Sequence, residues 1–519
     1  MRLHDYLDYR ARELPTIVFA QMEGGRSLSY PEAREESCRI GNALVAAGLS
    51  PGDRVAFLSK NSVELALFYY AASRVGVVPV PLNYRLAAPE WAYIINDSQA
   101  KLLFAQPSLA AALAPAEGEL TTVTRKIAVG GAVEGWETWE DFLGSAGTAP
   151  PDRDVGTNDD VYQMYTSGTT GRPKGAVLTH EAVSRQIQQA HMAFGGDPGD
   201  RALIVAPLYH AAASITAFVT VGGGGTLYIQ EDYEPTATVN ALAGENIRIA
   251  LLVPAMIQFC MAAVPDVKER SYDSLRTIVY GASPISEQTL REAIEVFGCE
   301  FLQGYGMTET TAALTYLMPK DHERALASDP GLLLSAGRPL VGTEVRIVDE
   351  NDKPLPNGTI GEVIGRGPQL MRGYWNLPEA SEAALRGGWM HTGDAGILDD
   401  DGYLYIQDRV KDMIVSGGEN VYPREVEEVL FQHPAVADAA VIGVPSEQWG
   451  EECKAVVVKK EGAEVTAEEI MEFCKGQLGG YKRPRSVDFI DALPRNPTGK
   501  VLKKDLREPY WKGHERRVS

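Results

Sequence analysis

A change of pattern near residue 343 restricts the fold of this chain more than any other feature. Before it, short apolar runs such as RVAFL (54–58) alternate with helical patterns such as SVELALFYYAASRVG (62–76), which we interpret as an amphipathic helix. Such alternation is typical of βαβ units and parallel sheets. Segments 345–367 and 395–409 are instead β-rich, with Asn-Gly and Asp-Gly turns. We therefore expect an α/β fold: stacked, mainly parallel sheets with flanking helices, followed by a β-rich subdomain.

The length of the chain indicates more than one domain. Its 519 residues and 56.3 kDa exceed what one ordinary hydrophobic core supports. After Arg409 the pattern changes again, to strand, loop, helix and strand. We expect an N-terminal domain at 1–408, a hinge at 409–411, and a small, mobile α+β domain at 412–519.

Charge and cysteine content exclude several classes of function. Lys and Arg number 49 against 70 Asp and Glu, which gives a net charge of −21 and a pI near 4.9. Binding to a nucleic-acid backbone needs a basic surface, so we expect no nucleic-acid partner. The five cysteines are scattered without CxxC spacing, which favours a reducing compartment over disulfides or a zinc site.

No segment of the sequence is typical of a membrane anchor. The N-terminus lacks the apolar core of a signal peptide. Segment 202–230 has no charged residue, but Pro207 and four consecutive glycines (222–225) interrupt it, so a buried helix, turn and strand fit better than a membrane span. We expect a cytoplasmic protein without an integral membrane segment, peripheral at a membrane if its substrate is long-chain.

Segment TSGTTGRPKG (166–175) combines hydroxyl side chains, glycines and one lysine. It is not a Walker A loop, because Gly175 rather than Ser or Thr follows Lys174. Backbone N–H groups around the glycines, the hydroxyls and the lysine can nonetheless bind an anion. The strand-like VYQMY (161–165) before it and the AVLTHEAVSRQIQQ helix (176–189) after it favour a phosphate loop over a plain polar loop.

Other segments carry chemistry only in combination. They are YGASPIS (280–286), QGYGMTETT (303–311), WMHTGDAG (389–396) and RNPTGKVLKK (495–504). Tyr305 can stack on a base, Thr308 can donate to a phosphate, Glu309 can bind Mg²⁺, and Asp394 can accept hydrogen bonds from ribose hydroxyls. Each of these segments alone is also compatible with an ordinary turn, and Lys500 alone with a solvated lysine.

In this order, the motifs TSGTTGRPKG, YGASPIS, GYGMTET, WMHTGD, DRVKDMIVSGGENVYPREVE and NPTGK resemble those of the AMP-forming adenylating enzyme superfamily. This superfamily includes acyl-CoA synthetases, carrier-loading adenylation domains and beetle luciferases. The resemblance extends from about residue 28 to Lys504. It implies that a carboxylate attacks the α-phosphate of ATP to give an acyl-adenylate, from which a thiol displaces AMP. ATP, Mg²⁺ and coenzyme A are the implied cofactor and cosubstrates.

The resemblance also implies roles for individual residues. The implied ATP site consists of Thr166, Ser167, Gly168, Thr169, Thr170, Gly171, Lys174, Gly281, Ala282, Ser283, Gln303, Gly304, Tyr305, Gly306, Met307, Thr308, Asp394, Arg409 and Lys500. The implied catalytic residues are Lys500, Thr308, Glu309 and His210, with Glu309 as the metal ligand. Asp394 and Arg409 would hold the ribose, and Lys500 would bridge the carboxylate and the α-phosphate.

The small domain is implied to move between the two half-reactions. It would swing about Lys411, withdraw Lys500, and bring Gly417 and Gly418 to the tunnel for the CoA thiol arm, where a narrow passage tolerates little side chain. His210 would stand between the acyl pocket and this tunnel.

The implied acyl pocket is apolar. It consists of His210, Ala211, Met256, Gly304, Gly306 and Met307. Segment HAAASITAF (210–218) lacks the acidic residue with which amino-acid-activating relatives pair a substrate ammonium. Gly306 stands where acetate-type relatives carry Trp, so we expect an open pocket and a small-molecule acid larger than propionate. A medium- or long-chain fatty acid and an aromatic acid of the hydroxycinnamate or benzoate type both fit.

We expect an acyl-CoA ligase, and three alternatives stay open. A stand-alone adenylation enzyme would load a separate carrier protein instead of CoA. A nucleotide sensor that has lost catalysis would show damage at Lys500, Glu309 or the 166–174 loop, and all three are intact. A luciferase-like oxidation needs an additional assumption. The sequence does not indicate an oligomeric state.

Overall fold

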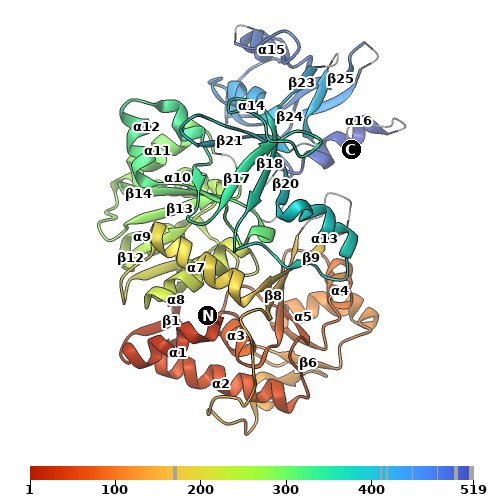
Figure 1. Cartoon of the computed structure of the whole chain (residues 1–519). Coiled ribbons are helices and arrows are strands. Elements are labelled where there is room, and N and C mark those ends of the chain that lie inside the picture. The colour runs from red at the N-terminus through yellow and green to blue at the C-terminus, as the bar shows by residue number, and fades with distance from the viewer. Residues whose placement is uncertain are drawn as a thin grey trace.

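The computed structural model describes residues 1–166, 172–283, 285–409, 412–416, 419–446, 448–475, 477–495 and 501–512, without the side chains of residues 408, 409, 419 and 420. Within these residues, strands β1 to β26 form five sheets that helices flank (Figure 1). Short 3-10 helices are η1 (Ala114–Glu119), η2 (Val267–Glu269), η3 (Thr308–Thr310), η4 (Pro330–Leu334) and η5 (Arg386–Gly388).

The largest sheet is mainly parallel and has nine strands in the described part of the chain. In spatial order these are β16 (Arg338–Pro339), β15 (Thr315–Leu317), β14 (Glu300–Tyr305), β13 (Thr277–Gly281), β12 (Ile247–Leu251), β10 (Arg201–Ile204), β11 (Thr226–Ile229), β1 (Val18–Met22) and β2 (Ser27–Ser29). All pairs from β14 to β1 are parallel, and the outer strands β16, β15 and β2 are antiparallel. The helices of this region are α7 (His180–Phe194), α8 (Ala211–Gly223), α9 (Pro235–Gly244), α10 (Pro254–Ala263), α11 (Glu287–Phe297) and α12 (Pro319–Ala327).

A second sheet near the N-terminus is parallel throughout. Its strands are β4 (Val78–Leu82), β3 (Arg54–Leu58), β5 (Leu102–Ala105), β6 (Arg125–Ala128) and β7 (Glu137–Thr138). The helices of this part are α1 (Leu3–Glu13), α2 (Tyr30–Ala46), α3 (Val63–Val75), α4 (Ala88–Asp97), α5 (Pro107–Leu113) and α6 (Trp139–Leu143).

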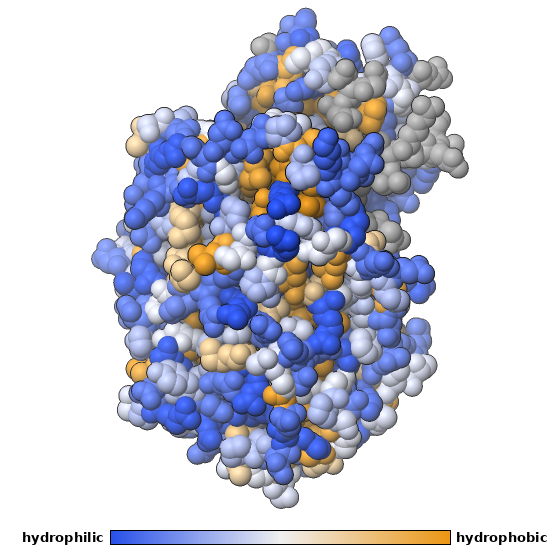
Figure 2. All heavy atoms as spheres, in the orientation of Figure 1, coloured by the Kyte–Doolittle hydropathy of each residue, from blue (hydrophilic) through white to orange (hydrophobic). Residues whose placement is uncertain are grey.

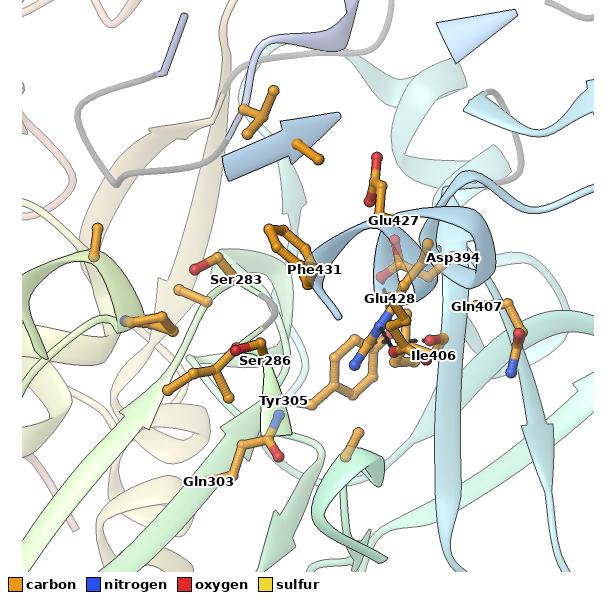
Figure 3. A pocket seen from close by; sticks show the side chains of 18 of the residues that line it. Ser283, Ser286, Gln303, Tyr305, Asp394, Ile406, Gln407, Glu427, Glu428 and Phe431 are labelled. Carbon is orange, nitrogen blue, oxygen red and sulfur yellow. Dashed lines mark hydrogen bonds and ion pairs between the residues drawn. The ribbon is translucent and has the colours of Figure 1, made fainter. Parts of the chain in front are cut away.

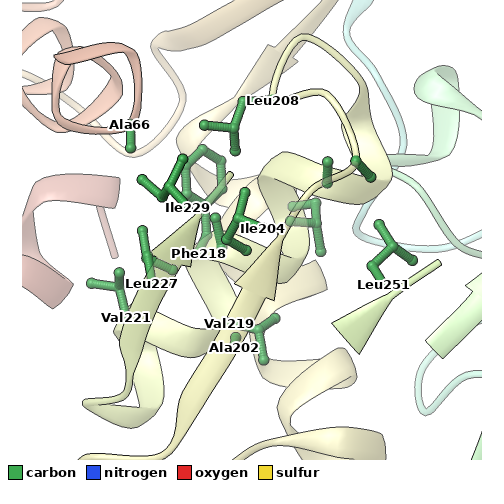
Figure 4. Close-up of a cluster of buried hydrophobic side chains, with 14 of the residues drawn as sticks. Ala66, Ala202, Ile204, Leu208, Phe218, Val219, Val221, Leu227, Ile229 and Leu251 are labelled. Carbon is green, nitrogen blue, oxygen red and sulfur yellow. The ribbon is translucent and has the colours of Figure 1, made fainter. Parts of the chain in front are cut away.

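Helix α3 links the cores of these two sheets and is not the amphipathic helix that we expected. Every residue of α3 except Glu64 is buried. The Phe68 ring lies 5.0 Å from that of Phe57 in β3, while Tyr69 packs edge-on against Phe218 in α8 at 5.3 Å. Figure 4 shows Phe218 in the cluster of apolar side chains between α8 and strands β10 and β11. A helix that is apolar on all sides is buried on all sides.

A three-stranded antiparallel sheet combines two strands from the N-terminal half of the chain with one from the C-terminal half. It contains β8 (Asp160–Thr166), β9 (Lys174–Thr179) and β19 (Gly373–Tyr374). Segment 176–179 is therefore a strand, and our expectation of a helix over it was wrong. Helix α7 begins only at His180, with the Thr179 hydroxyl as its N-cap, accepting from the Ala182 N–H at 3.2 Å. Pairing with strands on both sides outweighs local helix propensity here.

The remaining strands form two smaller sheets. The β-rich subdomain is antiparallel and consists of β17 (Glu344–Val348), β18 (Gly361–Arg366), β20 (Met390–Leu398) and β21 (Leu404–Arg409), with α13 (Pro378–Ala384) nearby. The C-terminal sheet consists of β23 (Glu419–Val421), β22 (Ile414–Ser416), β25 (Gly450–Lys459), β24 (Val436–Ser446) and β26 (Ser486–Phe489), with α14 (Pro423–Phe431), α15 (Ala467–Lys475) and α16 (Lys503–Trp511). The expected α/β fold class is confirmed, whereas the division at 409–411 remains a prediction.

Hydrophilic residues predominate on the face shown in Figure 2. In the described part of the chain, no helix has the length and apolar character that a membrane crossing requires. The uncharged segment 202–230 contributes to β10, α8 and β11, and nearly all of these residues are buried. The five cysteines are free.

Candidate active site

Two cavities meet at the C-terminal ends of β13 and β14. One of about 250 Å³ lies between this edge and the C-terminal part of the chain, and one of about 200 Å³ lies against α8. Ala282, Gly304 and Gly306 line both of them. Ligands of open α/β sheets bind beyond the carboxyl ends of the parallel strands, which is where these cavities join.

Close backbone packing explains the glycines at this edge. Gly281 and Gly304 are paired in the β13–β14 register, and a Cβ atom added to Gly281 would lie 2.2 Å from the Gly304 carbonyl oxygen. The next residue, Ala282, has a φ of 66°, in the left-handed region. The turn after β13 therefore leaves its backbone exposed toward the larger cavity.

The larger cavity contains a buried carboxylate beside a tyrosine. The Tyr305 hydroxyl donates to Asp394 Oδ2 at 2.8 Å, and the Asp394 N–H donates to the Thr392 hydroxyl at 3.1 Å. Asp394 is only 8% exposed and is paired with Arg409 across strands β20 and β21. The structure thus brings together Tyr305, Asp394 and the backbone of Arg409, three residues that the resemblance assigns to the ATP site. Ser283 and Gln303 line the same cavity.

The C-terminal part of the chain supplies the opposite wall. Figure 3 shows Glu427, Glu428 and Phe431 of α14 across the cavity from Ser283, Ser286 and Gln303. Arg424 donates to the Ile406 carbonyl at 3.0 Å, and Lys503 forms an ion pair with Glu427 at 2.9 Å. We assigned no role to these residues from the sequence. Their only signal is that Arg424 and Glu427 lie within the motif DRVKDMIVSGGENVYPREVE and Lys503 within RNPTGKVLKK.

A second carboxylate connects the phosphate-loop motif to η3. Glu309 is 4% exposed, and its Oε1 accepts from the Tyr374 hydroxyl at 2.7 Å and from the Thr166 hydroxyl at 3.3 Å. Lys174 Nζ lies 5.1 Å from the centre of the Tyr374 ring. The predicted residues Lys174 and Glu309 therefore share one neighbour, Tyr374, which sequence analysis missed, while Thr166 contacts Glu309 itself. A carboxylate surrounded by hydroxyls is a donor set that suits a hard cation such as Mg²⁺.

Helix α4 contacts both ends of the phosphate-loop segment. Before the loop, the Tyr165 hydroxyl donates to Asp97 Oδ2 at 2.6 Å. After it, the Tyr93 hydroxyl donates to the Pro173 carbonyl at 3.3 Å. Trp375, beside Tyr374, donates to the Asp97 carbonyl at 3.1 Å. The strands that carry the loop are therefore fixed to the N-terminal sheet.

The smaller cavity is apolar. Its lining includes Ala211, Ala212, Ala213, Ile215, Leu251, Val253, Met256, Val279, Met307, Ala312 and Ala313, with Phe194, Tyr280 and Tyr316 as aromatic residues and His210, Thr216 and Thr308 as polar ones. Among the described residues, no Asp, Glu, Lys or Arg lines it. The acyl-pocket residues predicted from the sequence therefore all lie around this one cavity, and Thr308 faces it as well.

His210 precedes α8 at the edge of the apolar cavity. Its Nε2 is buried and has no hydrogen-bond partner among the described residues. Burial lowers the pKa of His210 to about 3, and the positive charge of Arg85 contributes in the same direction. The imidazole is therefore neutral throughout the physiological range.

Gly306 lines both cavities. We expected the missing side chain to leave the acyl pocket open, but the space beside Gly306 is occupied by main-chain atoms. A Cβ atom added there would lie 2.5 Å from the Ala312 carbonyl oxygen and 2.6 Å from Ala313 Cα. A side chain at this position would meet the backbone of 312–313 before it reached the cavity. The glycine is needed for packing within the protein, in addition to any effect on pocket size.

Several predicted residues lie outside the described part of the chain. They are Ser167, Gly168, Thr169, Thr170, Gly171, Lys411, Gly417, Gly418 and Lys500, together with the side chain of Arg409. The roles given to them from the resemblance remain predictions.

The sequence matches known proteins over nearly its whole length. Residues 7–375 match the family described as AMP-binding enzyme, and residues 425–500 match the AMP-binding enzyme C-terminal domain. The chain is 39% identical to the fatty acid–[acyl-carrier-protein] ligase ScoC of Streptomyces coeruleorubidus, over 98% of this chain and 97% of ScoC. It is also 39% identical to a feruloyl-CoA synthase of an Amycolatopsis species, over 96% of this chain and 97% of that enzyme.

Solved structures agree with these matches. The chain superposes on ATP-bound MatB of Rhodopseudomonas palustris with a TM-score of 0.89, at 31% identity, over 99% of this chain and 100% of MatB. The TM-score to apo MatB is 0.79, so the arrangement of the chain is nearer to that of the ATP-bound form. The chain belongs to the AMP-binding enzyme family, and it is an AMP-forming acid–thiol ligase.

Proposed function

We propose that the protein joins a medium- or long-chain or aromatic carboxylic acid to coenzyme A through an acyl-adenylate. The observation that carries this proposal is the junction of the two cavities at Ala282, Gly304 and Gly306. A nucleotide in the larger cavity and an acyl group in the apolar one would meet at these residues, where the carboxylate and the α-phosphate must react. Holding two reactants in this way removes much of the entropic barrier of a bimolecular step.

Residues of the larger cavity and of the phosphate-loop motif would bind the different parts of ATP. Asp394, whose carboxylate accepts from the Tyr305 hydroxyl, would accept hydrogen bonds from the ribose hydroxyls, and the backbone at Ala282 would contact the adenine. Thr166 and Lys174 would bind the β- and γ-phosphates. Glu309 would hold Mg²⁺, which when bound neutralises phosphate charge.

The proposed reaction consists of two displacement steps, and in each step one bond forms and one breaks. A carboxylate oxygen forms a bond to the α-phosphorus of ATP, and the bond from that phosphorus to pyrophosphate breaks. The sulfur of the CoA thiolate then forms a bond to the acyl carbonyl carbon, and AMP leaves with the electron pair of the C–O bond. We propose that Lys500 stabilises the charge in the first step and that the 412–519 domain then turns about Lys411 to bring Gly417 and Gly418 to the thiol arm.

His210 fits the role of a gate between acyl group and thiol, without proton transfer. Its Tyr209 neighbour lies with ring centres 4.3 Å apart, which fixes the plane of the imidazole. Because the pKa of His210 is lowered to about 3, the ring is a poor acceptor for a thiol proton. A neutral ring also adds no charge to the apolar cavity.

The lining of the smaller cavity favours an acid with an apolar body. A second carboxylate or an ammonium on the substrate would be buried there without a partner charge, which is strongly unfavourable. ScoC acts on a fatty acid and the Amycolatopsis enzyme on ferulate, and both of these acids have an apolar body. Alanines at 211, 212, 213, 312 and 313 leave room for such a body.

The similarity to ScoC favours a second candidate, a ligase that loads a carrier protein. Both candidates are tested by incubating the protein with ATP, Mg²⁺ and a panel of fatty and aryl acids, with and without CoA, and identifying the products by mass. Acyl-CoA supports the first proposal, and acyl-AMP that accumulates despite CoA supports the second. Lys500→Ala is the control and should abolish adenylate formation. The absence of adenylate and thioester with every acid would contradict both.

A further inference from the structure

The wall of the apolar cavity contains one tyrosine whose hydroxyl is poorly satisfied. Tyr316 in β15 pairs with Gly304 of β14, and its ring stands beside that glycine, since a Cβ atom at Gly304 would lie 3.1 Å from Tyr316 Cε1. Tyr316 packs edge-on against Phe194, with ring centres 6.1 Å apart, and both residues line the cavity. The position is therefore part of the acyl pocket and only 6% exposed.

The hydroxyl of Tyr316 has a single long contact within the described structure. Gln186 Nε2 donates to it at 3.5 Å, the outer limit of a hydrogen bond. Gln186 is fully buried in α7, and its Oε1 has no partner among the described residues. The two ends of an amide are interchangeable in such assignments. In either orientation this pair keeps at least one polar group unsatisfied, which is unfavourable in a buried site.

Of the other polar side chains of the cavity, Thr216 and Tyr280 are engaged within the protein, whereas His210 Nε2 has no partner among the described residues. The Thr216 hydroxyl donates to the Ala212 carbonyl at 2.8 Å, within its own helix. Tyr280 also lines the cavity, but its hydroxyl lies 2.8 Å from His322 Nε2. Buried polar groups are nearly always paired, so the Tyr316–Gln186 pair calls for a partner that the protein itself does not supply.

We propose that Tyr316, held from behind the cavity wall by Gln186, recognises a neutral hydrogen-bonding substituent on the acyl group, such as a hydroxyl on an aromatic ring. This proposal rests on the proposed function, because it concerns the acid bound in the same cavity. A substituent hydroxyl can accept a hydrogen bond from the Tyr316 hydroxyl, while Gln186, which does not line the cavity, keeps its contact with the same Tyr316 oxygen. A charged substituent does not fit, since no charged residue among those described lines the cavity. The preferred substrate is therefore a hydroxylated acid rather than its unsubstituted analogue.

Matched pairs of acids test this inference. We would measure kcat/KM for CoA thioester formation with cinnamate and its 3- and 4-hydroxy derivatives, and with benzoate and its hydroxy derivatives. A site built to bond a hydroxyl discriminates strongly against the analogue that lacks it, so we expect at least one hydroxylated acid to be preferred by about tenfold or more. Tyr316→Phe and Gln186→Leu should each bring this ratio close to one.

Tyr280→Phe is the matched control, because it removes a hydroxyl from the same cavity that already has a partner. It should leave the preference for the hydroxylated acid unchanged. Thermal unfolding identifies any variant that fails to fold, and the isosteric Tyr316→Phe keeps the test valid if Gln186→Leu does fail. Equal kcat/KM for both members of every pair, or a preference that survives Tyr316→Phe, would overturn the inference. No thioester from any acid would instead contradict the proposed function.

Discussion

Two buried histidines make the stability of the N-terminal part sensitive to acid. His4 of α1 and His180 at the start of α7 lie with ring centres 6.5 Å apart. The Leu3 N–H donates to His180 Nδ1 at 3.3 Å, and His180 Nε2 is buried without a partner among the described residues. His4 Nδ1 lies 2.8 Å from the Ser73 hydroxyl. Burial lowers the pKa of His4 to about 4 and that of His180 to about 3.

The direction of the effect follows from these pKa values. Both lie below the ordinary value of 6.5, so the unfolded chain binds protons that the folded chain does not. The stability that comes from burying these two histidines in the neutral form is fully present above pH 6.5, and it is lost as the pH falls toward 4. At pH 5 each histidine should lower the free energy of unfolding by about 2 kcal/mol relative to pH 8, and the pair by about 4 kcal/mol.

Urea unfolding of the wild type and of His180→Gln at pH 8 and pH 5 measures how much His180 contributes to the loss of unfolding free energy between these pH values. The glutamine keeps a hydrogen-bond acceptor and cannot be protonated in this range. Protonation of other groups is common to both proteins, so the loss of stability between the two pH values should be about 2 kcal/mol smaller in the variant. His191→Gln, at an exposed position of the same helix, should behave as the wild type. An equal loss in the wild type and in His180→Gln would refute the reasoning.

Three further predictions concern the candidate site. Tyr305→Phe removes a hydrogen bond worth about 1 kcal/mol from Asp394, so KM for ATP should rise about fivefold; Asp394→Asn should raise it further, and an unchanged KM would exclude the ribose role. Tyr374→Phe keeps the ring beside Lys174 but removes the donor to Glu309, so the Mg²⁺ concentration for half-maximal rate should shift while KM for the acid stays constant. Ala213→Phe fills the apolar cavity, so kcat/KM for long or aryl acids should fall at least about tenfold more than for acetate, as a panel of acids would show.

The sequence predicts the position of a site residue well where the residues next to it determine the local course of the chain. Tyr305, Asp394 and the strands around them follow from short segments with glycines and turn residues, and the structure brings these side chains within hydrogen-bond distance. The parallel order of the large sheet follows from alternating strand and helix patterns. These features depend on local chain direction, which neighbouring residues determine.

Long-range packing explains what the sequence did not predict. Tyr374 reaches Glu309 only because β19 pairs with β9, and no local pattern indicates that pairing. We expected helix α3 to be amphipathic, yet every one of its residues except Glu64 is buried. The α14 wall of the larger cavity depends on how the C-terminal part lies against β21, where Arg424 reaches the Ile406 carbonyl.

The packing of Gly306 against the backbone at 312–313 has a consequence for how this ligase can change its substrate. A single mutation at Gly306 would first displace the main chain after η3, so the altered enzyme would lose stability before it gained selectivity. The alanines at 211–213, at the start of α8, line the cavity. Successive substitutions at 211–213 therefore offer a gradual route to smaller acids, in the laboratory or in evolution. To narrow the pocket by a larger residue at 306, the end of β14 and the turn at 312–313 would have to change together.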